Sequence, residues 1–320
     1  MPSISSKFLV DPELAPALDQ FPPFNFSPET LPMMRAGLAE MAKATAGATV
    51  SGVDREVRHV PGPKGAPDVR IVIYTPKDAK APRPALFHIH GGGYIMGAPE
   101  MSEPSNMALA KDIGCTLVSV DYRLAPETPH PGPVEDCYAA LKWLFDNAKD
   151  LGVDATRIAV GGESAGGGLS AALALLARDR GEVKLAFQLL IYPMIDDRTV
   201  THTDPHPYAG EYIWTPESNR FGWASLIGGE PGSKGVSPYA AAARAEDLRG
   251  LPPAFISVGA LDLFLEEDME YARRLARAGV PTELHIYPGA FHGFNMSAPS
   301  RVSTNFNRDS KEALRKALHG

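Results

Sequence analysis

Cysteine and long apolar runs are scarce in this sequence, and both shortages narrow the class of protein. Only two of the 320 residues are cysteines, Cys115 and Cys137, and they force no disulfide. We expect both thiols to be buried and unpaired, as suits a reducing cytoplasm. No apolar run approaches the roughly 18 residues that a membrane span needs. Asp11 and Glu13 interrupt the apolar start that a secretory leader requires. The sequence therefore predicts a cytoplasmic protein without a membrane span.

Positive charge is also limited. The chain has 31 Lys and Arg against 38 Asp and Glu, a formal net charge of −7, and no basic stripe. This acidic balance argues against nucleic acid as a partner. Hydrophobic residues make up 44% of the chain and charged residues 22%, which is typical of a globular protein with a large core.

Short apolar runs alternate with helical patterns along most of the chain. This alternation predicts an α/β fold with a mostly parallel sheet and helices on both faces. Two earlier runs, 55–60 and 68–74, flank a turn rich in Pro and Gly and predict an antiparallel pair. The strands expected after that pair are 85–90, 115–121, 158–161, 186–192, 254–258 and 283–287. The helices expected between them are 105–113, 134–148, 165–179 and 266–278.

Two segments fall outside this alternation. Residues 1–50 are dotted with Pro and Met and contain a helical stretch at 31–44. Residues 196–237 are rich in Pro, His, Trp and Gly and separate two expected core strands. We interpret the first as an N-terminal cap segment and the second as a lid insertion. The core would then consist of 51–195 and 238–320.

The sequence Gly-Glu-Ser-Ala-Gly at 162–166 places Ser164 on a tight turn between an expected strand and an expected helix. Such a turn lifts the hydroxyl clear of the sheet. Gly162 and Gly166 fit it, because larger side chains two positions either side of the serine would clash with the neighbouring strand and helix. The short pattern also occurs by chance, but here His-Gly-Gly-Gly-Tyr stands upstream at 90–94. The combination predicts that Ser164 is a nucleophile.

A serine nucleophile needs a histidine to accept its proton and a carboxylate to orient that histidine. In a fold of this kind the acid and then the histidine follow the serine along the chain. Asp262 follows the strand expected at 254–258, and His292 follows the last expected strand, so both would lie at the carboxyl end of the sheet. We expect them to complete a triad. The acidic residues 266–268 fall in the next helix, where they would stabilise its N-terminus.

The glycines after the first parallel strand predict an oxyanion hole. Acyl transfer places negative charge on the substrate carbonyl oxygen, and N–H groups must already point at it. We expect the N–H groups of Gly92, Gly93 and Ala165 to be the donors, with Gly91 shaping the turn. His90 precedes the serine in the chain, and we expect it to brace this loop rather than act as a base.

Other features of the sequence permit competing interpretations. His202, Asp204 and His206 could bind a metal, but a solvated lid loop is the simpler interpretation. The glycines around Ser164 are not a phosphate-binding loop, because no Gly-Lys-Ser/Thr follows them. We therefore predict neither metal nor cofactor. Aromatic residues of the two cap segments could wall a pocket or only pack the lid on the core; they are Phe24, Phe26, Tyr212, Trp214, Phe221 and Trp223.

Five elements together resemble the bacterial hormone-sensitive-lipase-like (family IV) carboxylesterases, which are α/β-hydrolases with a helical cap. They are HGGGY at 90–94, DYRLAPE at 121–127, GESAG at 162–166, Asp262 and FHGF at 291–294. The resemblance extends over about residues 69–294. It implies Ser164 as the nucleophile, Asp262 and His292 as its partners, and the HGGG glycines as the oxyanion hole. It also implies hydrolysis of short- to medium-chain carboxylic esters through an acyl-enzyme, without a cofactor.

One motif departs from the family pattern. The acid motif of the family commonly reads Asp-Pro-Leu-x-Asp-Glu, whereas Leu263 and Phe264 follow Asp262 here. We expect these two side chains to reshape the pocket wall. Glu163 fills a position often held by Asp in relatives, which indicates a structural role beside the site. The residues expected at the substrate pocket are Tyr94, Glu163, Tyr192, Trp214, Phe264 and Phe291.

The sequence leaves several functions open. A deacetylase acting on a sugar or an antibiotic, or an amidase, would use the same triad as a carboxylesterase. A catalytically silent ligand-binding protein could also be built on this fold, although the complete triad favours an enzyme acting on a small-molecule ester. The last expected strand, 283–287, could pair with a second copy and form a homodimer, as the resemblance allows.

Overall fold

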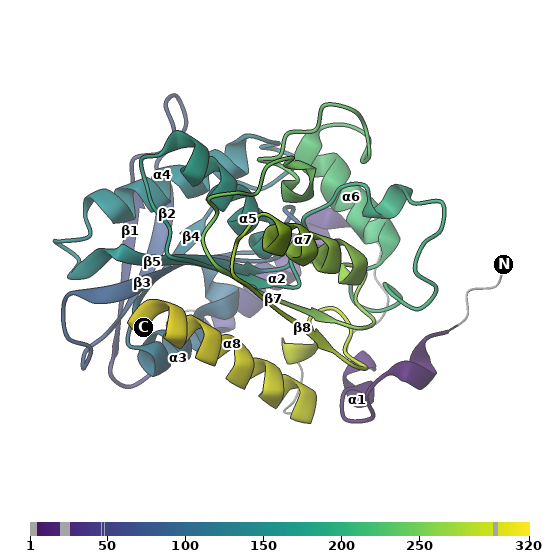
Figure 1. Cartoon of the computed structure of the whole chain (residues 1–320), viewed down its shortest axis with the longest axis horizontal. Coiled ribbons are helices and arrows are strands. Elements are labelled where there is room, and N and C mark those ends of the chain that lie inside the picture. The colour runs from purple at the N-terminus through teal and green to yellow at the C-terminus, as the bar shows by residue number, and fades with distance from the viewer. Residues whose placement is uncertain (1–4, 20–25, 46, 48, 297–299) are drawn as a thin grey trace.

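A computed structural model describes residues 5–19, 26–45, 47, 49–296 and 300–320 of the chain. At its centre is a sheet of eight strands, with helices on both faces (Figure 1). The strands are β1 (Val53–Val60), β2 (Val69–Pro76), β3 (Arg83–Ile89), β4 (Thr116–Asp121), β5 (Val153–Glu163), β6 (Phe187–Ile191), β7 (Ala254–Gly259) and β8 (Thr282–Tyr287).

The strand order across the sheet is β1-β2-β4-β3-β5-β6-β7-β8. β1 and β2 are antiparallel, as are β2 and β4, and every later pair is parallel. The predicted antiparallel pair and the mostly parallel sheet are therefore confirmed. The parallel strands β3 and β6 are buried almost throughout. Such strands consist of continuous apolar runs, which made them recognisable in the sequence.

The helices cover the two faces of the sheet in separate layers. α3 and α8 lie on one face, and α4, α5 and α7 lie on the other (Figure 1). The α-helices are α1 (Ala15–Leu18), α2 (Leu31–Thr45), α3 (Glu103–Ile113), α4 (Gly132–Asp146), α5 (Ala165–Arg180), α6 (Pro216–Ile227), α7 (Leu265–Arg277) and α8 (Arg301–His319). The short 3₁₀ helices are η1 (Lys7–Leu9), η2 (Pro99–Ser102), η3 (Thr199–Thr201), η4 (Ala242–Arg244) and η5 (Phe294–Met296).

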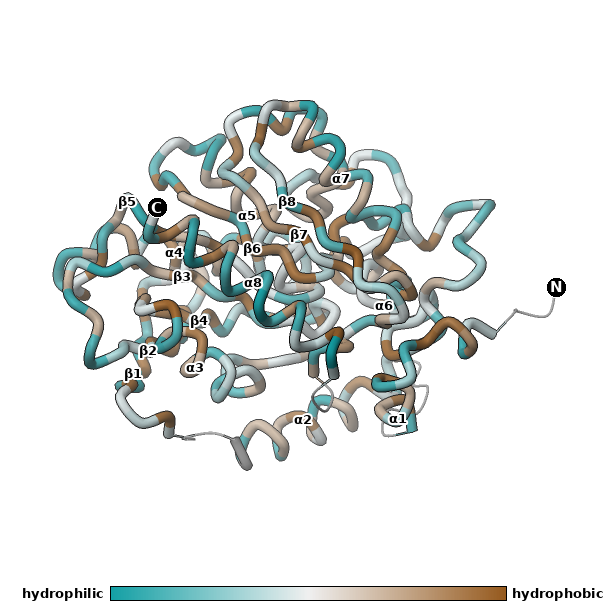
Figure 2. Tube along the Cα trace, turned by 60° about the horizontal axis from the view of Figure 1, so that its bottom comes forward, coloured by the Kyte–Doolittle hydropathy of each residue, from teal (hydrophilic) through white to brown (hydrophobic). Residues whose placement is uncertain are grey.

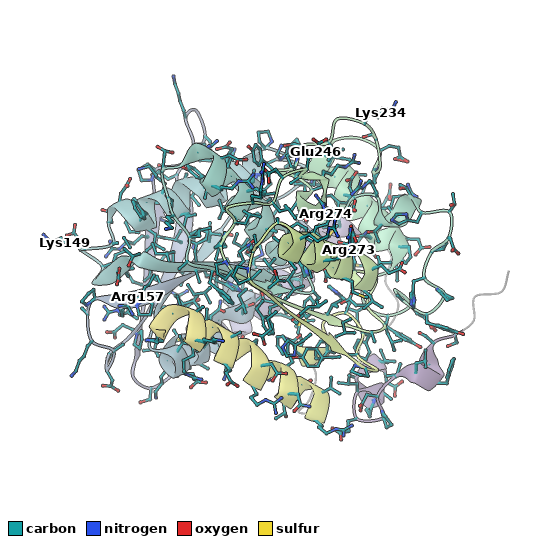
Figure 3. The ribbon with its side chains drawn as sticks, viewed as in Figure 1. Lys149, Arg157, Lys234, Glu246, Arg273 and Arg274 are labelled. Atoms are coloured by element: carbon teal, nitrogen blue, oxygen red, sulfur yellow. The ribbon has the colours of Figure 1, made fainter. Side chains whose placement is uncertain are left out.

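Helix α8 is absent from the elements that we predicted. Its buried side chains form a narrow apolar face against the sheet and include Val302, Phe306, Ala313, Leu314 and Leu318. The rest of the helix is polar. Arg157 of β5, labelled in Figure 3, donates a hydrogen bond of 3.2 Å to the carbonyl oxygen of Leu318. This bond ties the C-terminal end of α8 to the first half of β5.

The N-terminal segment, interpreted from the sequence as a cap segment, also contributes residues to the core. The tube in Figure 2 shows apolar stretches concentrated in the central strands, whereas α2 lies along the edge of the molecule. Upstream of α2, however, Val10, Leu14 and Ala17 are buried in the main hydrophobic cluster. The N–H of Asp11 donates to the carbonyl of Gly289 at 3.0 Å. This segment is therefore anchored beside the loop that follows β8.

The insertion between β6 and β7 carries η3 and α6 and lies beside α7 (Figure 1). A buried ion pair fixes its beginning. Asp197 is fully buried and accepts hydrogen bonds of 2.7 Å from Nε and Nη2 of Arg244. The N–H of Gly232 donates to the same carboxylate at 2.7 Å. Both ends of the insertion are thus tied to one carboxylate.

Both cysteines are buried and unpaired, as the sequence predicted. Burial raises the pKa of the Cys115 thiol to about 12. Among the helices of the described residues, none combines the length and the apolar character needed to cross a membrane.

Candidate active site

Three polar side chains meet at the carboxyl edge of the sheet. Ser164 directly follows β5, Asp262 lies three residues after β7, and His292 lies five residues after β8. The carboxyl ends of parallel strands open on the same side, so residues distant in the chain converge there. The structure brings the three predicted triad residues together.

The triad side chains form a continuous hydrogen-bonded chain. Nε2 of His292 lies 3.0 Å from Oγ of Ser164, and its Nδ1 lies 2.8 Å from Oδ2 of Asp262. The other oxygen of Asp262 accepts the N–H of Phe264 at 3.0 Å. Asp262 is fully buried, while Ser164 and His292 are 7% and 6% exposed. This geometry lets the histidine accept the serine proton while the carboxylate orients the ring.

Ser164 has an unusual backbone conformation, with φ 56° and ψ −121°. Its N–H donates to the carbonyl of Ile191 at 2.9 Å, which holds the turn against β6. A Cβ added to Gly162 or Gly166 would lie 2.1 or 2.0 Å from the carbonyl oxygen of Ile89 on β3. Only glycine fits at these two positions, as the sequence predicted. The close packing keeps the strained serine in place.

The glycine loop after β3 leaves its amides available. Gly92, Gly93 and Tyr94 have φ values of 118°, 61° and 67°. Within the described part of the chain, no acceptor pairs with the N–H of Gly92, Gly93 or Ala165. A Cβ at position 91 would lie 2.9 Å from the carbonyl oxygen of Glu163, which precedes the nucleophile. A glycine at this position therefore lets the loop approach the turn that carries Ser164. Unpaired N–H groups beside a nucleophile suit a developing oxyanion.

Two aromatic rings hold the imidazole of His292. Tyr192 packs edge-on with a centroid distance of 4.8 Å, and Phe264 packs edge-on at 5.1 Å. The hydroxyl of Tyr192 donates to Oδ1 of Asn295 at 2.7 Å. The backbone of Tyr192 has a positive φ of 34°, which is uncommon for a residue other than glycine. Tyr192 and Phe264 were expected at the substrate pocket, and here they contact the triad histidine. No sequence motif points to Asn295.

Trp214 from the insertion lies over the glycine loop. A Cβ at Gly93 would meet its ring at 2.1 Å, and its Nε1–H donates to Oδ1 of Asn219 at 3.0 Å. The ring of Phe26 lies 5.6 Å from it, so the two cap segments meet above the loop. Phe24, which we considered with these aromatic residues, lies outside the described residues. Phe291 is 1% exposed and faces Tyr212 edge-on at 6.0 Å.

Tyr94, expected at the substrate pocket, is fully buried. Its hydroxyl donates to the carbonyl of Met194 at 2.5 Å and occupies the space left by Gly168. The side chain therefore links the glycine loop to the segment that follows β6.

Glu163 binds a histidine behind the nucleophile. Its Oε2 lies 3.1 Å from Nε2 of His88, whose Nδ1 lies 3.0 Å from Oγ of Ser119. Burial opposes ionisation of this carboxyl group, but the pairing with His88 holds the pKa of Glu163 below its ordinary value. Because His88 is 2% exposed, the pair anchors the residue before Ser164 in the core.

His90 packs against Tyr122 with a centroid distance of 4.3 Å and nearly parallel planes. Its Nδ1 lies 2.8 Å from the carbonyl of Gly91, and the Tyr122 hydroxyl donates to the carbonyl of His90 at 3.0 Å. Burial lowers the pKa of the His90 ring. A neutral ring in these contacts braces the glycine loop.

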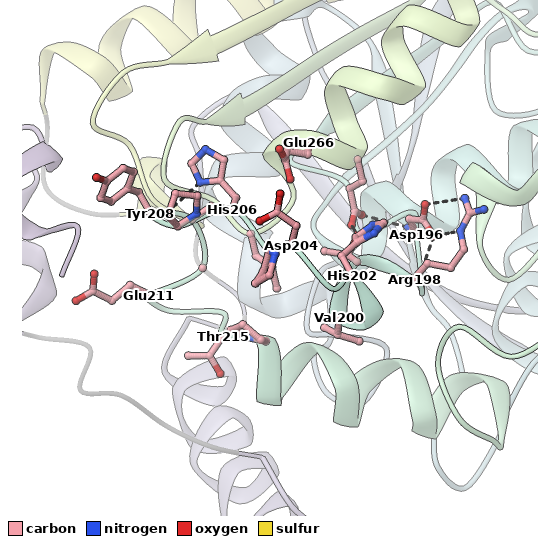
Figure 4. A pocket seen from close by; sticks show the side chains of 18 of the residues that line it. Asp196, Arg198, Val200, His202, Asp204, His206, Tyr208, Glu211, Thr215 and Glu266 are labelled. Carbon is pink, nitrogen blue, oxygen red and sulfur yellow. Dashed lines mark hydrogen bonds and ion pairs between the residues drawn. The ribbon is translucent and has the colours of Figure 1, made fainter. Parts of the chain in front are cut away.

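The residues considered as metal ligands lie elsewhere. His202, Asp204 and His206 line a cavity of about 1130 Å³ between the insertion and α7, and no triad residue lines it (Figure 4). Figure 4 shows these side chains spread along the wall. Across the ranges that the structure describes, no group of three or more His, Cys, Asp or Glu is arranged to hold a metal ion.

This sheet, with its sharp serine turn after β5, defines an α/β-hydrolase. Residues 86–296 of the chain match the sequence pattern of a protein family described as having the alpha/beta hydrolase fold. The chain is 35% identical over 317 residues to carboxylesterase NlhH of Mycobacterium tuberculosis strain H37Rv, covering 97% of each protein. It is 32% identical over 332 residues to esterase LipI of the same strain, covering 100% of each. The solved structure of a bacterial heroin esterase is similar with a TM-score of 0.92 and 41% identity, over 98% of this chain and 100% of that one.

The chain therefore belongs to the hormone-sensitive-lipase-like carboxylesterases of the α/β-hydrolase fold. It is a carboxylic-ester hydrolase.

Proposed function

We propose that this enzyme hydrolyses short- to medium-chain carboxylic esters through an acyl-enzyme on Ser164. The observation that carries the proposal is the chain of contacts from the serine hydroxyl through His292 to Asp262, at 3.0 and 2.8 Å. Serine is a weak nucleophile unless a positioned base accepts its proton. His292 is the base in contact with it.

The reaction follows from these positions. Oγ of Ser164 attacks the ester carbonyl carbon while Nε2 of His292 takes the hydroxyl proton. The negative charge that develops on the carbonyl oxygen is stabilised by the N–H groups of Gly92, Gly93 and Ala165. The intermediate then collapses, and His292 returns the proton to the departing alkoxide as alcohol. In the second half, His292 accepts a proton from the water that attacks the acyl-enzyme, and the carboxylic acid leaves as Ser164 regains its proton.

We propose a cap built from residues 1–50 and 196–237 over a core of 51–195 and 238–320. The contact between Phe26 and Trp214 supports a joint cap, because one ring comes from each segment. A roof formed by Trp214 above Gly93 limits the room beside the oxyanion hole. Limited room supports short acyl chains, since a pocket favours each added methylene only until it is full.

We further propose a cytoplasmic homodimer. The two buried, unpaired thiols support a reducing compartment. β8 is an edge strand whose Ile286 is 39% exposed, and open strand edges are places where a second chain can pair. Light scattering after gel filtration tests this: a dimer that Ile286→Lys converts to monomer supports it, and a wild-type monomer contradicts it.

The triad proposal is tested by Ser164→Ala with p-nitrophenyl acetate as substrate. We expect kcat to fall by about 10⁶, because the nucleophile is lost, with the circular dichroism spectrum unchanged. Ser310→Ala is the matched control: its buried hydroxyl donates to the carbonyl of Phe306 on the same helix, α8, and takes no part in the triad contacts. Substantial turnover by purified Ser164→Ala would refute the proposal. Faster turnover of the matching anilide than of the ester would identify an amidase instead.

A further inference from the structure

Arg35 of α2 reaches from the cap to the glycine loop. Its Nε–H donates to the carbonyl oxygen of Ile95, and its Nη2–H donates to the carbonyl oxygen of Ala125, both at 2.7 Å. Glu127 accepts two further hydrogen bonds from the same guanidinium, at 2.7 and 2.9 Å. One side chain outside the sheet layers thus holds two backbone carbonyls and a carboxylate.

These carbonyls flank the segment that shapes the oxyanion hole. Ile95 directly follows Tyr94, whose φ of 67° is unfavourable for an aromatic residue. The N–H of Ala125 donates to the carbonyl of Tyr94 at 3.0 Å. Arg35 therefore closes a ring of hydrogen bonds between the glycine loop and the following DYRLAPE segment. Strained backbone of this kind persists only where its surroundings hold it.

An apolar contact accompanies this hydrogen bonding. Leu31, Ile95 and Ala125 form a small buried cluster that is separate from the main core. Leu31 and Arg35 are four residues apart on α2, so they lie on the same face of the helix. One turn of α2 thus presents both an apolar and a charged contact to the glycine loop.

The ion pair with Glu127 has a secondary role. The Glu127 side chain is 63% exposed, and exposed ion pairs contribute little to stability. The pair adds two hydrogen bonds to a guanidinium that already donates to both loop carbonyls. The two backbone contacts are the part of this arrangement that bears on the site.

We propose that Arg35 is a positioning residue of the oxyanion hole. By holding the carbonyls of Ile95 and Ala125, it fixes the loop so that the N–H groups of Gly92 and Gly93 face the forming oxyanion. The inference rests on the proposed role of those N–H groups. Because a preorganised hole acts on the charge of the transition state more than on the neutral ester, its loss lowers kcat rather than raising KM.

The first test compares Arg35→Met with Lys43→Met, using p-nitrophenyl acetate. Lys43 lies on the same helix, but its side chain is 72% exposed and pairs only with Glu40 among the contacts described. We expect Arg35→Met to lower kcat roughly tenfold to a hundredfold, with KM changed less than about threefold, because the donors lose alignment. Lys43→Met should behave as the wild type. A rise in KM at unchanged kcat would overturn the proposal, as would wild-type kinetics of Arg35→Met.

The second test separates positioning from a general loss of structure. Oγ of Ser164 adds to the carbonyl carbon of a trifluoromethyl ketone analogue while His292 takes the hydroxyl proton, and the ketone oxygen then carries negative charge in the hole. We expect its inhibition constant in Arg35→Met to rise by the same factor by which kcat/KM falls. An unchanged inhibition constant would overturn the proposal. A wild-type enzyme that the ketone does not inhibit would instead refute the proposed triad mechanism, so the two failures are distinguishable.

Two milder variants keep the inference testable if Arg35→Met fails to fold. Arg35→Lys retains the charge but not the fork that reaches two carbonyls, so we expect an intermediate loss of kcat and an intermediate rise of the inhibition constant. Glu127→Gln retains both carbonyl contacts, and we expect less than about a threefold change in kcat. Wild-type values for Arg35→Lys in both measurements would contradict the positioning role.

Discussion

Asp262 and Asp268 are both fully buried carboxyl groups, but their surroundings differ. Asp262 accepts hydrogen bonds from His292 and from the N–H of Phe264. Neither oxygen of Asp268 has a hydrogen-bond partner among the described residues. Burial, followed by the charges of Glu267 and Asp262, raises the pKa of Asp268 well above its ordinary value. Asp262 is thus held by hydrogen bonds, whereas the raised pKa of Asp268 favours its neutral acid form.

Replacing the orienting carboxylate should abolish most of the activity. We expect Asp262→Asn to lower kcat by about 10⁴ with a small effect on KM, because the amide favours the wrong tautomer of His292. The matched control is Asp268→Asn, which changes a neighbouring buried carboxyl group outside the triad contacts. Steady-state kinetics of both variants decide this. A severe loss in Asp268→Asn together with a mild one in Asp262→Asn would show that the wrong carboxylate was assigned.

Asp268→Asn should also change how stability depends on pH. Near the ordinary pKa of Asp, roughly 3.9, the unfolded chain begins to lose a proton that the native state retains. The stability contributed by a group with a raised pKa is complete below that value and is lost as pH rises toward the folded pKa. Asn has no proton to lose, so we expect Asp268→Asn to gain stability over the wild type as pH rises, by about 1.4 kcal/mol per unit of pKa elevation.

Urea unfolding at about pH 4.5 and about pH 8 measures this difference, since both values lie above the ordinary pKa of Asp. A free energy of unfolding, variant minus wild type, that increases toward the higher pH supports the assignment of a neutral Asp268. A difference that is the same at both pH values would mean that the group is ionised in the folded protein, because neither state then binds the proton.

The triad could be predicted from the sequence because each member stands shortly after a recognisable strand. Ser164, Asp262 and His292 are placed by local turns, so strand order alone brings them to one edge. Arg35 and Asn295 gave no such signal, since each acts through a contact with a loop distant in sequence. The packing of Tyr94 could not be predicted, because its motif shows only that it adjoins the glycines. Its direction depends on the space left by Gly168.

At the scale of elements, a buried ion pair holds the insertion to the core. Removing Arg244 at η4 leaves the fully buried carboxylate of Asp197 with the N–H of Gly232 as its one remaining partner among the described residues. We expect Arg244→Met to destabilise the protein by about 3–5 kcal/mol, because an unpaired buried charge is strongly unfavourable. The double variant Asp197→Asn/Arg244→Met should recover part of the loss. Urea unfolding of both variants measures their free energies of unfolding. A double variant that is no more stable than Arg244→Met would contradict the role of this ion pair.

The strands were easier to predict than the helices. β7 and β8 were expected within one residue of their observed bounds because short apolar runs end at Pro and Gly. β5 starts at Val153, five residues before the expected strand, because its first half is polar and its pairing with β3 is irregular. α8 escaped prediction because its apolar positions are widely spaced among charged residues, although Leu314 and Leu318 follow the helical period.

For the whole molecule, the N-terminal segment and the insertion both reach the glycine loop beside the site, as the proposed cap requires. The N-terminal segment buries Leu14 in the core and places Arg35 at the glycine loop, while the insertion places Trp214 over Gly93. The sequence indicated these segments by their break in periodicity. It could not show that the first one also belongs to the core, because a few isolated apolar residues such as Val10 carry no period.

The enclosed site should limit the length of the acyl chain. We expect kcat/KM to peak at acyl chains of roughly two to eight carbons and then to fall, because methylenes beyond the filled pocket add no burial. A panel of p-nitrophenyl esters measures the profile. Trp214→Ala should shift the optimum toward longer chains, since it removes the roof beside the oxyanion hole. A preference for long-chain esters with activation at an oil–water interface would contradict the esterase assignment.

The central claim is that ester cleavage proceeds through an acyl group on Ser164. Its most direct test is intact-protein mass spectrometry of enzyme quenched with acid during turnover of p-nitrophenyl acetate, followed by peptide mapping. The account predicts one added acetyl group per chain, located on Ser164 and absent from Ser164→Ala. Turnover without any adduct, or with the acetyl group on another residue, would contradict it.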